Sequence, residues 1–266
     1  MKVRPAVPIP PDPATIEFYV NVLRTLDRHA VPHAVGGGYA MAHYTGIARN
    51  TKDLDLFIKP EDRDRCLSTL AAVGYTTEFF YEYWIAKALA GPEPDAAFVD
   101  ILYNSGNGIC TVDDEWFQHA IEVDVLGYRS RLVPAEEQLW SKAFVQDRDR
   151  FDGADVIHLI LAQGRKMDWH RLTRRFQGHE RVLLAHLLLF QYTYPTERDA
   201  VPAWVVPNLE AAIRDESPPD ARLCRGAILA HSGSYTVPLK DWEFEDARIQ
   251  PHGPLTPEQV SQLPHH

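Results

Sequence analysis

The chain lacks an excess of positive charge. Its 266 residues include 27 Lys and Arg against 37 Asp and Glu, which gives a formal net charge of -10. Domains that bind nucleic acid over a broad surface are usually basic, so a contact with RNA would need a local basic patch here. The composition is otherwise that of a globular protein, with 45% hydrophobic residues, enough for a sizeable core.

Cysteine pairs and long apolar runs are also lacking. The three cysteines, Cys66, Cys110 and Cys224, are an odd number without the spacing of metal ligands. We therefore expect reduced, buried thiols and a cytoplasmic location. The longest apolar run, 182–190, is interrupted by His186 and is too short to cross a bilayer, so no membrane partner is expected.

The order of patterns along the chain predicts an α+β half followed by a helical half. Prolines make residues 1–13 an extended arm at the start of a first domain, 1–134. The character changes at Pro134, after which helical periodicity dominates and predicts a helical domain at 135–231. The polar, proline-containing remainder, 232–266, is predicted to be loop or tail.

Hydrophobic periodicity predicts the individual elements. Apolar residues at helical spacing indicate helices, and short apolar or alternating runs indicate strands. Helices are expected at 15–29, 39–44, 61–73, 135–146, 154–163, 169–176, 179–192 and 208–214, and strands at 31–35, 54–58, 98–103, 121–126 and 129–133.

The segment 35–58 is the most informative part of the sequence. Three glycines, 36–38, stand between a predicted strand and a predicted helix. Glycine lets the backbone approach a ligand closely, and the first N–H groups of the following helix are free to bind an anion. Taken alone, three glycines can equally form only a tight turn.

Two aspartates further along this segment strengthen the interpretation. Asp53 and Asp55 are two residues apart, so in a strand both side chains point to the same face. Neighbouring carboxylates repel each other and lose solvation, and a hard divalent cation, Mg²⁺ or Mn²⁺, relieves both costs. The alternative is a solvated strand edge. The glycine turn just upstream favours a metal site.

These residues resemble the GG…DxD signature of the DNA polymerase β-like nucleotidyltransferase superfamily. Within it, the form GG-x-A…R-x-T-x-D-x-D is similar to the AbiEii-type toxin group and its bacterial relatives. The resemblance implies a nucleotidyltransferase-type mixed sheet with flanking helices, and its strict part spans 37–55. It is carried by Gly37, Gly38, Tyr39, Ala40, Gly46, Arg49, Thr51, Asp53 and Asp55.

The resemblance also implies a reaction. Such an enzyme transfers a nucleoside monophosphate from a nucleoside triphosphate to a hydroxyl group and releases pyrophosphate. It implies that Asp53 and Asp55 hold Mg²⁺ or Mn²⁺, with the active cleft between the two domains. Gly37 and Gly38 are expected to let backbone amides hold the triphosphate. Arg49 and Thr51 are expected to touch the phosphates or, alternatively, to stabilise the turn.

A third carboxylate is expected on the metal that activates the acceptor. Asp100 lies inside the apolar run 97–102, where a charge is costly unless it is paired or binds a metal. This run resembles the third motif of the family, although Asp100 could instead pair with a basic residue. Asp124 is the competitor, but it alternates with apolar residues beside Glu122, as on the solvated face of an edge strand, so we favour Asp100.

One lysine of the helical half is a further candidate. The spacing of Lys142, Arg148 and Asp155 resembles a segment of AbiEii-type proteins, which would place Lys142 near the triphosphate or the acceptor. The alternative is a surface charge network of the i,i+4 kind. The sequence does not decide between the two.

The acceptor is left open among RNA, a small molecule and a protein. Arg171, Arg174 and Arg175 share one face of a predicted helix and could meet RNA phosphates, although a solvated helix face is the commoner explanation. The alternative function is a catalytically weak or inactive nucleotide-binding protein, or a toxin–antitoxin interaction protein that needs a protein partner. An empty third-carboxylate position would favour the first, and co-purification with a partner the second.

Overall fold

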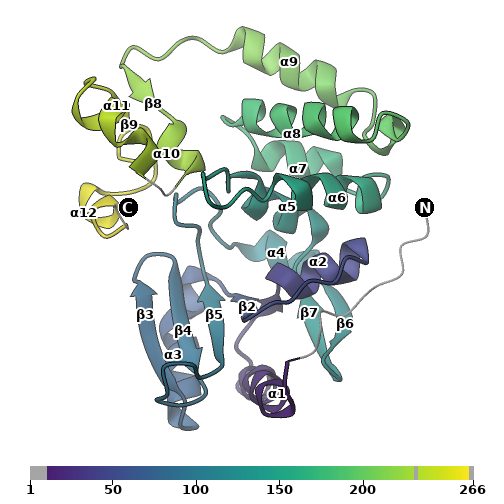
Figure 1. Cartoon of the computed structure of the whole chain (residues 1–266), viewed down its shortest axis with the longest axis vertical. Coiled ribbons are helices and arrows are strands. Elements are labelled where there is room, and N and C mark those ends of the chain that lie inside the picture. Colours follow the sequence, from purple (N-terminus) through teal and green to yellow (C-terminus); the bar gives the residue numbers. More distant parts are fainter. Residues whose placement is uncertain (1–10, 231–232, 264–266) are drawn as a thin grey trace. The chain divides into compact units, whose positions relative to one another are not determined.

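The computed structural model describes residues 11–230 and 233–263 (Figure 1). The described chain forms two compact units. One contains the described residues up to 105 together with 109–134, and the other contains 106–108 and the residues from 135 onward. Of the expected arm, residues 1–10 lie outside the described part, and Pro13 already begins a helix.

The first unit is built on a seven-stranded mixed sheet. The strand order is β3-β4-β5-β2-β1-β7-β6, with β2–β5 and β1–β7 parallel and the other neighbours antiparallel. This sheet, with its helices, confirms the predicted α+β class. The strands are β1 (Ala34–Val35), β2 (Leu54–Phe57), β3 (Thr76–Tyr81), β4 (Ile85–Leu89), β5 (Phe98–Leu102), β6 (Ile121–Val125) and β7 (Tyr128–Leu132).

Helices flank this sheet. The first begins where Asp12 accepts hydrogen bonds from the backbone N–H groups of Ala14 and Thr15, with Pro13 in the first turn. Leu23 on its inner face is fully buried. The helices of this unit are α1 (Pro13–Arg28), α2 (Gly37–Thr45), the 3-10 turn η1 (Pro60–Asp62), α3 (Arg63–Ala72) and α4 (Asp114–Gln118).

The hairpin of β3 and β4 was not expected from the sequence. β3 pairs with β4, and β4 pairs in turn with β5 over its whole length. The hairpin therefore extends the sheet beyond β5 and makes β5 an interior strand, which changes the surroundings of Asp100.

Five helices dominate the second unit, and all five were expected. Figure 1 shows them stacked, and α8 packs against both α6 and α9. They are α5 (Ala135–Ala143), α6 (Gly153–Gln163), α7 (Trp169–Arg175), α8 (Glu180–Thr193) and α9 (Val205–Asp215). None of the helices in 11–230 or 233–263 has the length and apolar character needed to cross a membrane.

The segment predicted to be loop or tail contains short elements. Its apolar residues Leu255, Val260 and Leu263 are buried, and Thr256 forms a capping box with Gln259. The sequence pattern missed this packing because each element is shorter than two turns or four residues. The short elements of this unit are η2 (Arg198–Ala200), β8 (Leu223–Cys224), α10 (Gly226–Leu229), η3 (Gly233–Tyr235), α11 (Thr236–Lys240), β9 (Glu245–Asp246) and α12 (Pro257–Ser261).

Candidate active site

Strand register makes two of the candidate aspartates direct neighbours. β2 and β5 run parallel, and Asp55 pairs with Asp100. Residues that face each other across two strands have side chains on the same side of the sheet. The residues next to each aspartate, such as Leu54 and Val99, are fully buried on the opposite side. The two carboxylates therefore share one face, as the alternation in the sequence indicated.

Asp53 lies one residue before β2 and two residues before Asp55. Its carboxylate accepts a hydrogen bond from the Thr51 hydroxyl at 3.0 Å, and both residues are half-buried. Thr51 thus holds Asp53 rather than being free to turn outward. Arg49 is exposed in the loop that leads to this segment.

The acidic residues lie near enough to two tyrosines for their charges to raise the pKa values of both hydroxyl groups. Burial raises the pKa of Tyr19, and the charges of Asp53, Asp55 and Asp100 all add to this shift. Burial and the charge of Asp53 raise the pKa of Tyr39 to about 12. The Tyr39 hydroxyl is buried and has no hydrogen-bond partner among the described residues. This hydroxyl group therefore lies near Asp53 without a hydrogen bond from any described residue.

The glycine turn touches the acidic pair. Gly37 has φ +54°, and a β-carbon built on it would lie 1.6 Å from Oδ2 of Asp55. The turn is also tied to β2, because the Gly36 N–H donates to the Asp55 carbonyl at 2.9 Å. At Gly38 a β-carbon would lie 3.0 Å from the Thr51 side chain. Any residue with a β-carbon at position 37 would displace the Asp55 carboxylate, so the conformation of the turn and the position of Asp55 depend on each other.

A lysine that the sequence pattern does not single out pairs with Asp100. Lys87 of β4 is opposite Asp100 in the register, and its Nζ lies 2.9 Å from Asp100 Oδ1. Both side chains are largely buried, at 18% and 14% exposure. Burial raises the pKa of Asp100, the Lys87 charge opposes this rise, and the charge of Asp53 adds to it. The signal in the sequence was a single lysine within the apolar run 85–89.

The competing aspartate lies elsewhere on the sheet. Asp124 is exposed on β6, which is the edge strand, and accepts a hydrogen bond from the Gly127 N–H at 2.9 Å in the turn to β7. The register thus places Asp100, and not Asp124, beside Asp55.

The donor set suits a hard divalent cation in its chemistry. Carboxylate oxygens are the ligands that Mg²⁺ and Mn²⁺ prefer, and a bound cation would offset the repulsion between the paired aspartates. As the side chains stand, however, no group of three or more His, Cys, Asp or Glu within the described ranges is arranged around one metal position. The carboxylate of Asp100 is instead paired with Lys87.

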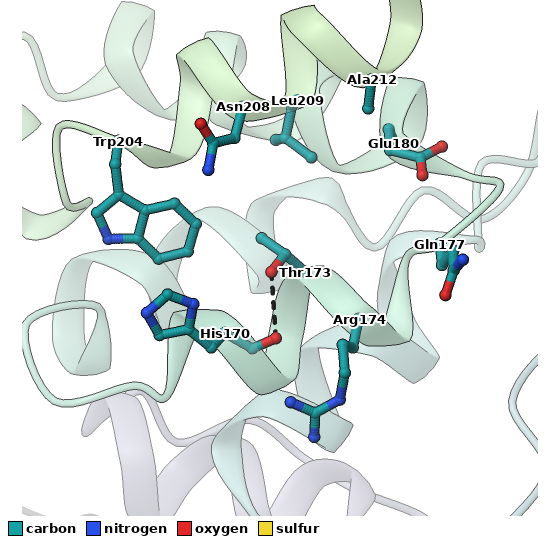
Figure 2. Close-up of a pocket in the computed structure, with 9 residues that line it drawn as sticks. All are labelled: His170, Thr173, Arg174, Gln177, Glu180, Trp204, Asn208, Leu209 and Ala212. Atoms are coloured by element: carbon teal, nitrogen blue, oxygen red, sulfur yellow. Dashed lines mark hydrogen bonds between the residues drawn. The ribbon is translucent and has the colours of Figure 1, made fainter. Parts of the chain in front are cut away.

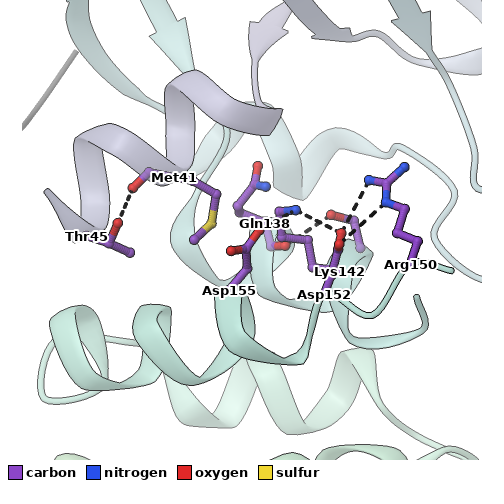
Figure 3. Close-up of polar contacts among 8 residues, drawn as sticks. Met41, Thr45, Gln138, Lys142, Arg150, Asp152 and Asp155 are labelled. Atoms are coloured by element: carbon purple, nitrogen blue, oxygen red, sulfur yellow. Dashed lines mark hydrogen bonds and ion pairs between the residues drawn. The ribbon is translucent and has the colours of Figure 1, made fainter. Parts of the chain in front are cut away.

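Lys142 lies in a buried charge network of the second unit (Figure 3). Its Nζ is 2.9 Å from both Asp152 Oδ2 and Asp155 Oδ2, and all three side chains are at most 13% exposed. Arg150 also contacts Asp152. Burial raises the pKa of Asp152, but the charges of Lys142 and Arg150 outweigh it and lower this pKa on balance. The network joins α6 to α5 and is not of the surface i,i+4 kind.

The arginine face of α7 is not a solvated stripe, and this expectation was wrong. Arg171 is buried, with ion pairs of 2.7 Å to Glu136 and 3.3 Å to Glu137. Arg175 lies 3.3 Å from the same Glu137. Burial raises the pKa of Glu137 to about 7, although both arginines oppose the rise. These arginines fasten α7 to α5 and are not available to RNA phosphates.

The remaining arginine of this face lines a hollow of about 430 Å³ in the second unit (Figure 2). Arg174 contributes to its wall on α7, while α9 contributes Asn208. At one end the ring of His170 stacks on Trp204, with centroids 4.4 Å apart. Arg174 therefore has different surroundings from Arg171 and Arg175, and the three do not form one basic patch.

Comparison with known proteins identifies the segment that carries the glycine turn and the aspartates. Residues 19–91 match the family model of aminoglycoside-2''-adenylyltransferase. This match covers about a quarter of the chain and includes Gly37, Gly38, Asp53 and Asp55, but not Asp100. No curated protein matches the sequence.

Solved structures with a similar chain course include three nucleotidyltransferase-like proteins. The antibiotic-resistance factor ANT(2'')-Ia is 18% identical, with a TM-score of 0.45, over 66% of this chain and 98% of its own. The lincosamide antibiotic adenylyltransferase LnuA is 16% identical, with a TM-score of 0.37, over 54% and 94%. An antigenic nucleotidyltransferase-like protein from Paracoccidioides brasiliensis is 16% identical, with a TM-score of 0.43, over 71% and 94%. Values this low do not indicate an activity.

The family match and the motif agree on the class of the protein. Residues 19–91 are a nucleotidyltransferase segment, and the chain is accordingly a nucleotidyltransferase. The match is to an adenylyltransferase family and not to the AbiEii-type group.

Proposed function

We propose that this protein transfers a nucleoside monophosphate, in the first instance AMP, from a nucleoside triphosphate to a hydroxyl group of a small polar molecule. The observation that carries the proposal is the register of Asp55 with Asp100 beside the glycine turn, within a unit that contains the segment matching an adenylyltransferase family. We take residues 1–134 as the nucleotidyltransferase domain and 135–231 as the helical domain.

In this proposal the aspartates hold the metal and the glycine turn holds the nucleotide. Asp53, Asp55 and Asp100 would bind Mg²⁺ or Mn²⁺, which when bound offsets the charge that develops at the α-phosphate. Asp100 would accept the proton of the attacking hydroxyl. The backbone N–H groups at Gly37 and Gly38 would donate to phosphate oxygens at the start of α2.

Three further residues have supporting roles in the proposal. Thr51 orients Asp53 through its hydroxyl, as the 3.0 Å hydrogen bond supports. Arg49, exposed in the adjoining loop, would contact the triphosphate. Lys142 of the helical domain is the third nucleotide-binding candidate, and its buried pairing with Asp152 and Asp155 would fix its position.

A small acceptor is favoured over RNA. The arginines that could have met RNA phosphates are divided between buried ion pairs and the wall of a hollow. The net charge of -10 repels a polyanion and attracts a cationic molecule such as an amino sugar. The matched family is named for adenylyl transfer to position 2'' of an aminoglycoside, which is a compound of this kind.

The test is pyrophosphate release with each of the four nucleoside triphosphates, Mg²⁺ and a panel of hydroxyl compounds that includes aminoglycosides and lincosamides. We expect release with ATP and at least one cationic acceptor, and none from the Asp53→Asn variant. Labelled RNA is a parallel acceptor. Labelling of RNA with no small-molecule product would overturn the acceptor class and favour the AbiEii-type alternative. No binding of any nucleotide would overturn the activity itself.

A further inference from the structure

A row of charged residues crosses the sheet on the face of the candidate site. Register pairs Glu78 of β3 with Lys87 of β4, Lys87 with Asp100 of β5, and Asp100 with Asp55 of β2. Directly paired residues project to the same side. Lys87 therefore belongs to the same surface as the aspartates, one strand beyond the third carboxylate.

The position of Lys87 is closely defined. Its Nζ lies 2.9 Å from Asp100 Oδ1, 3.7 Å from the ring centroid of Phe98 and 5.3 Å from that of Phe80. The aromatic faces attract a cation and hold the ammonium group beside the carboxylate. At 18% exposure the side chain has little freedom to move into solvent. This lysine is placed much more firmly than a surface ion pair.

From this arrangement we infer that Lys87 is a built-in counter-ion that competes with the divalent metal for Asp100 and so sets the metal affinity of the site. The inference rests on the proposed function. Without metal, Lys87 supplies the positive charge that makes a carboxylate tolerable inside an interior strand. When a metal takes up Asp100, the ammonium group keeps its contacts with Phe98 and Phe80, and its charge opposes the added cation.

The alternative is that Lys87 serves only the stability of the sheet. A purely structural ion pair would leave metal binding to Asp53 and Asp55 and would not respond to the metal. The two explanations predict different changes in metal affinity when the charge of Lys87 is removed. Removing a competing cation tightens metal binding, whereas removing a structural partner leaves it unchanged or weakens it by loosening the site.

The experiment is calorimetric titration of the whole metal-free protein with Mn²⁺ alone, at constant ionic strength, without nucleotide. Lys87→Met keeps the unbranched stem between the phenylalanines and removes the charge. We expect Mn²⁺ to bind it roughly tenfold to a hundredfold more tightly than the unmodified protein. Lys87→Arg keeps the charge and should bind within a few-fold of the unmodified protein.

Lys59→Met is the matched control. Lys59 is similarly shielded, at 23% exposure, and is paired with Glu61 and Asp114. Its loss removes one ion-paired lysine of the same unit, and Mn²⁺ binding should stay unchanged. The double variant Lys87→Met with Asp100→Asn completes a cycle, since the gain should disappear when Asp100 carries no charge.

The outcomes separate this inference from the proposed function. If the unmodified protein binds Mn²⁺ and Lys87→Met binds it equally or more weakly, the competition is refuted while the metal site stands. If neither protein binds Mn²⁺, the proposed metal site fails and takes the inference with it. If only Lys87→Met binds, the competition is supported in its strongest form. Should Lys87→Met fold poorly, Lys87→Gln gives the same comparison.

Discussion

Replacing Gly37 with alanine tests whether the glycine turn positions the acidic pair. The residue has φ +54°, a region that costs a residue with a β-carbon about 1 to 2 kcal/mol. The new β-carbon would also lie 1.6 Å from Oδ2 of Asp55, where real contacts stay above 3.0 Å. The carboxylate has to move by more than about 1 Å, which exceeds the roughly 0.5 Å tolerance of a working site.

We expect two separable effects of Gly37→Ala. The free energy of unfolding falls by about 1 to 3 kcal/mol without metal, because the backbone strain and the displaced Asp55 both act on the native state. The affinity for Mg²⁺ falls at least about tenfold, since a ligand has lost its position. A tenfold loss removes about 1.4 kcal/mol of metal-dependent stabilisation, or about 2 to 4 °C of the metal-induced rise in melting temperature.

The assay is thermal unfolding with chelator and with millimolar Mg²⁺, and Gly127→Ala is the control. Gly127 has φ +81° and nothing within 4 Å of the position of a β-carbon, so alanine there adds backbone strain without touching a carboxylate. We expect Gly127→Ala to melt earlier but keep the full rise on addition of Mg²⁺. A full rise in Gly37→Ala would refute the idea that the turn positions Asp55. If the rise were lost in both variants, the loss would be a general effect of backbone strain and not specific to Asp55.

Three further predictions concern the acidic residues of the first unit and the buried ion pairs of the second. Asp53→Asn should abolish the Mg²⁺-induced rise in melting temperature, while Asp124→Asn on the edge strand should keep it, and equal behaviour would show that the register does not define the site. Arg171→Ala should lower the free energy of denaturant unfolding by about 3 to 5 kcal/mol because it removes the ion pair of the buried Glu136 and leaves the buried Glu137 with Arg175 alone, whereas Arg174→Ala should change it by no more than about 0.5 kcal/mol. Glu137 has its pKa raised from 4.5 to about 7, so its contribution to stability is complete below pH 4.5 and is lost as the pH rises through about 7. Between pH 5 and 8 the free energy of unfolding should therefore fall more in the unmodified protein than in Glu137→Gln, by on the order of 2 kcal/mol, and parallel pH curves would contradict the assignment.

The segment 35–58 could be understood from the sequence because its information is local. Glycines that need an unusual backbone conformation stand next to a helix start, and the spacing of Asp53 and Asp55 fixes a common face whatever the sheet looks like. Asp100 could also be identified as a candidate from the sequence, because a charged residue inside an apolar strand is costly unless it is paired or binds a metal. The register that sets it opposite Asp55 is a property of the whole sheet and was beyond a local pattern.

The environment of Asp100 was missed for an equally physical reason. Strand β4 contains Ala86, Ala88 and Leu89 around Lys87, which are residues that favour helices in isolation. Its strand conformation comes from pairing with β3 on one side and β5 on the other. Because β4 was not predicted as a strand, Lys87 could not be identified as the partner of Asp100.

The arginines of α7 also show that a local sequence pattern does not predict long-range contacts. Their helical spacing put Arg171 and Arg175 on one face correctly, but periodicity does not say what covers that face. The covering residues, Glu136 and Glu137, belong to a helix more than thirty positions earlier in the chain. The sequence shows that the first turn of α5 is acidic, but it does not show which of the basic residues in the chain pairs with that turn.

Several departures from ordinary sheet construction meet at the candidate site. Like charges directly opposite each other destabilise a strand pair, yet Asp55 and Asp100 are paired in register. The Tyr39 hydroxyl beside Asp53 is buried without a hydrogen-bond partner among the described residues. Gly37 is held in a left-handed conformation against the Asp55 carboxylate. The paired like charges and the unsatisfied hydroxyl each cost stability on their own. Lys87 offsets part of this charge, and a cation bound by the aspartates, as proposed above, would offset more of it.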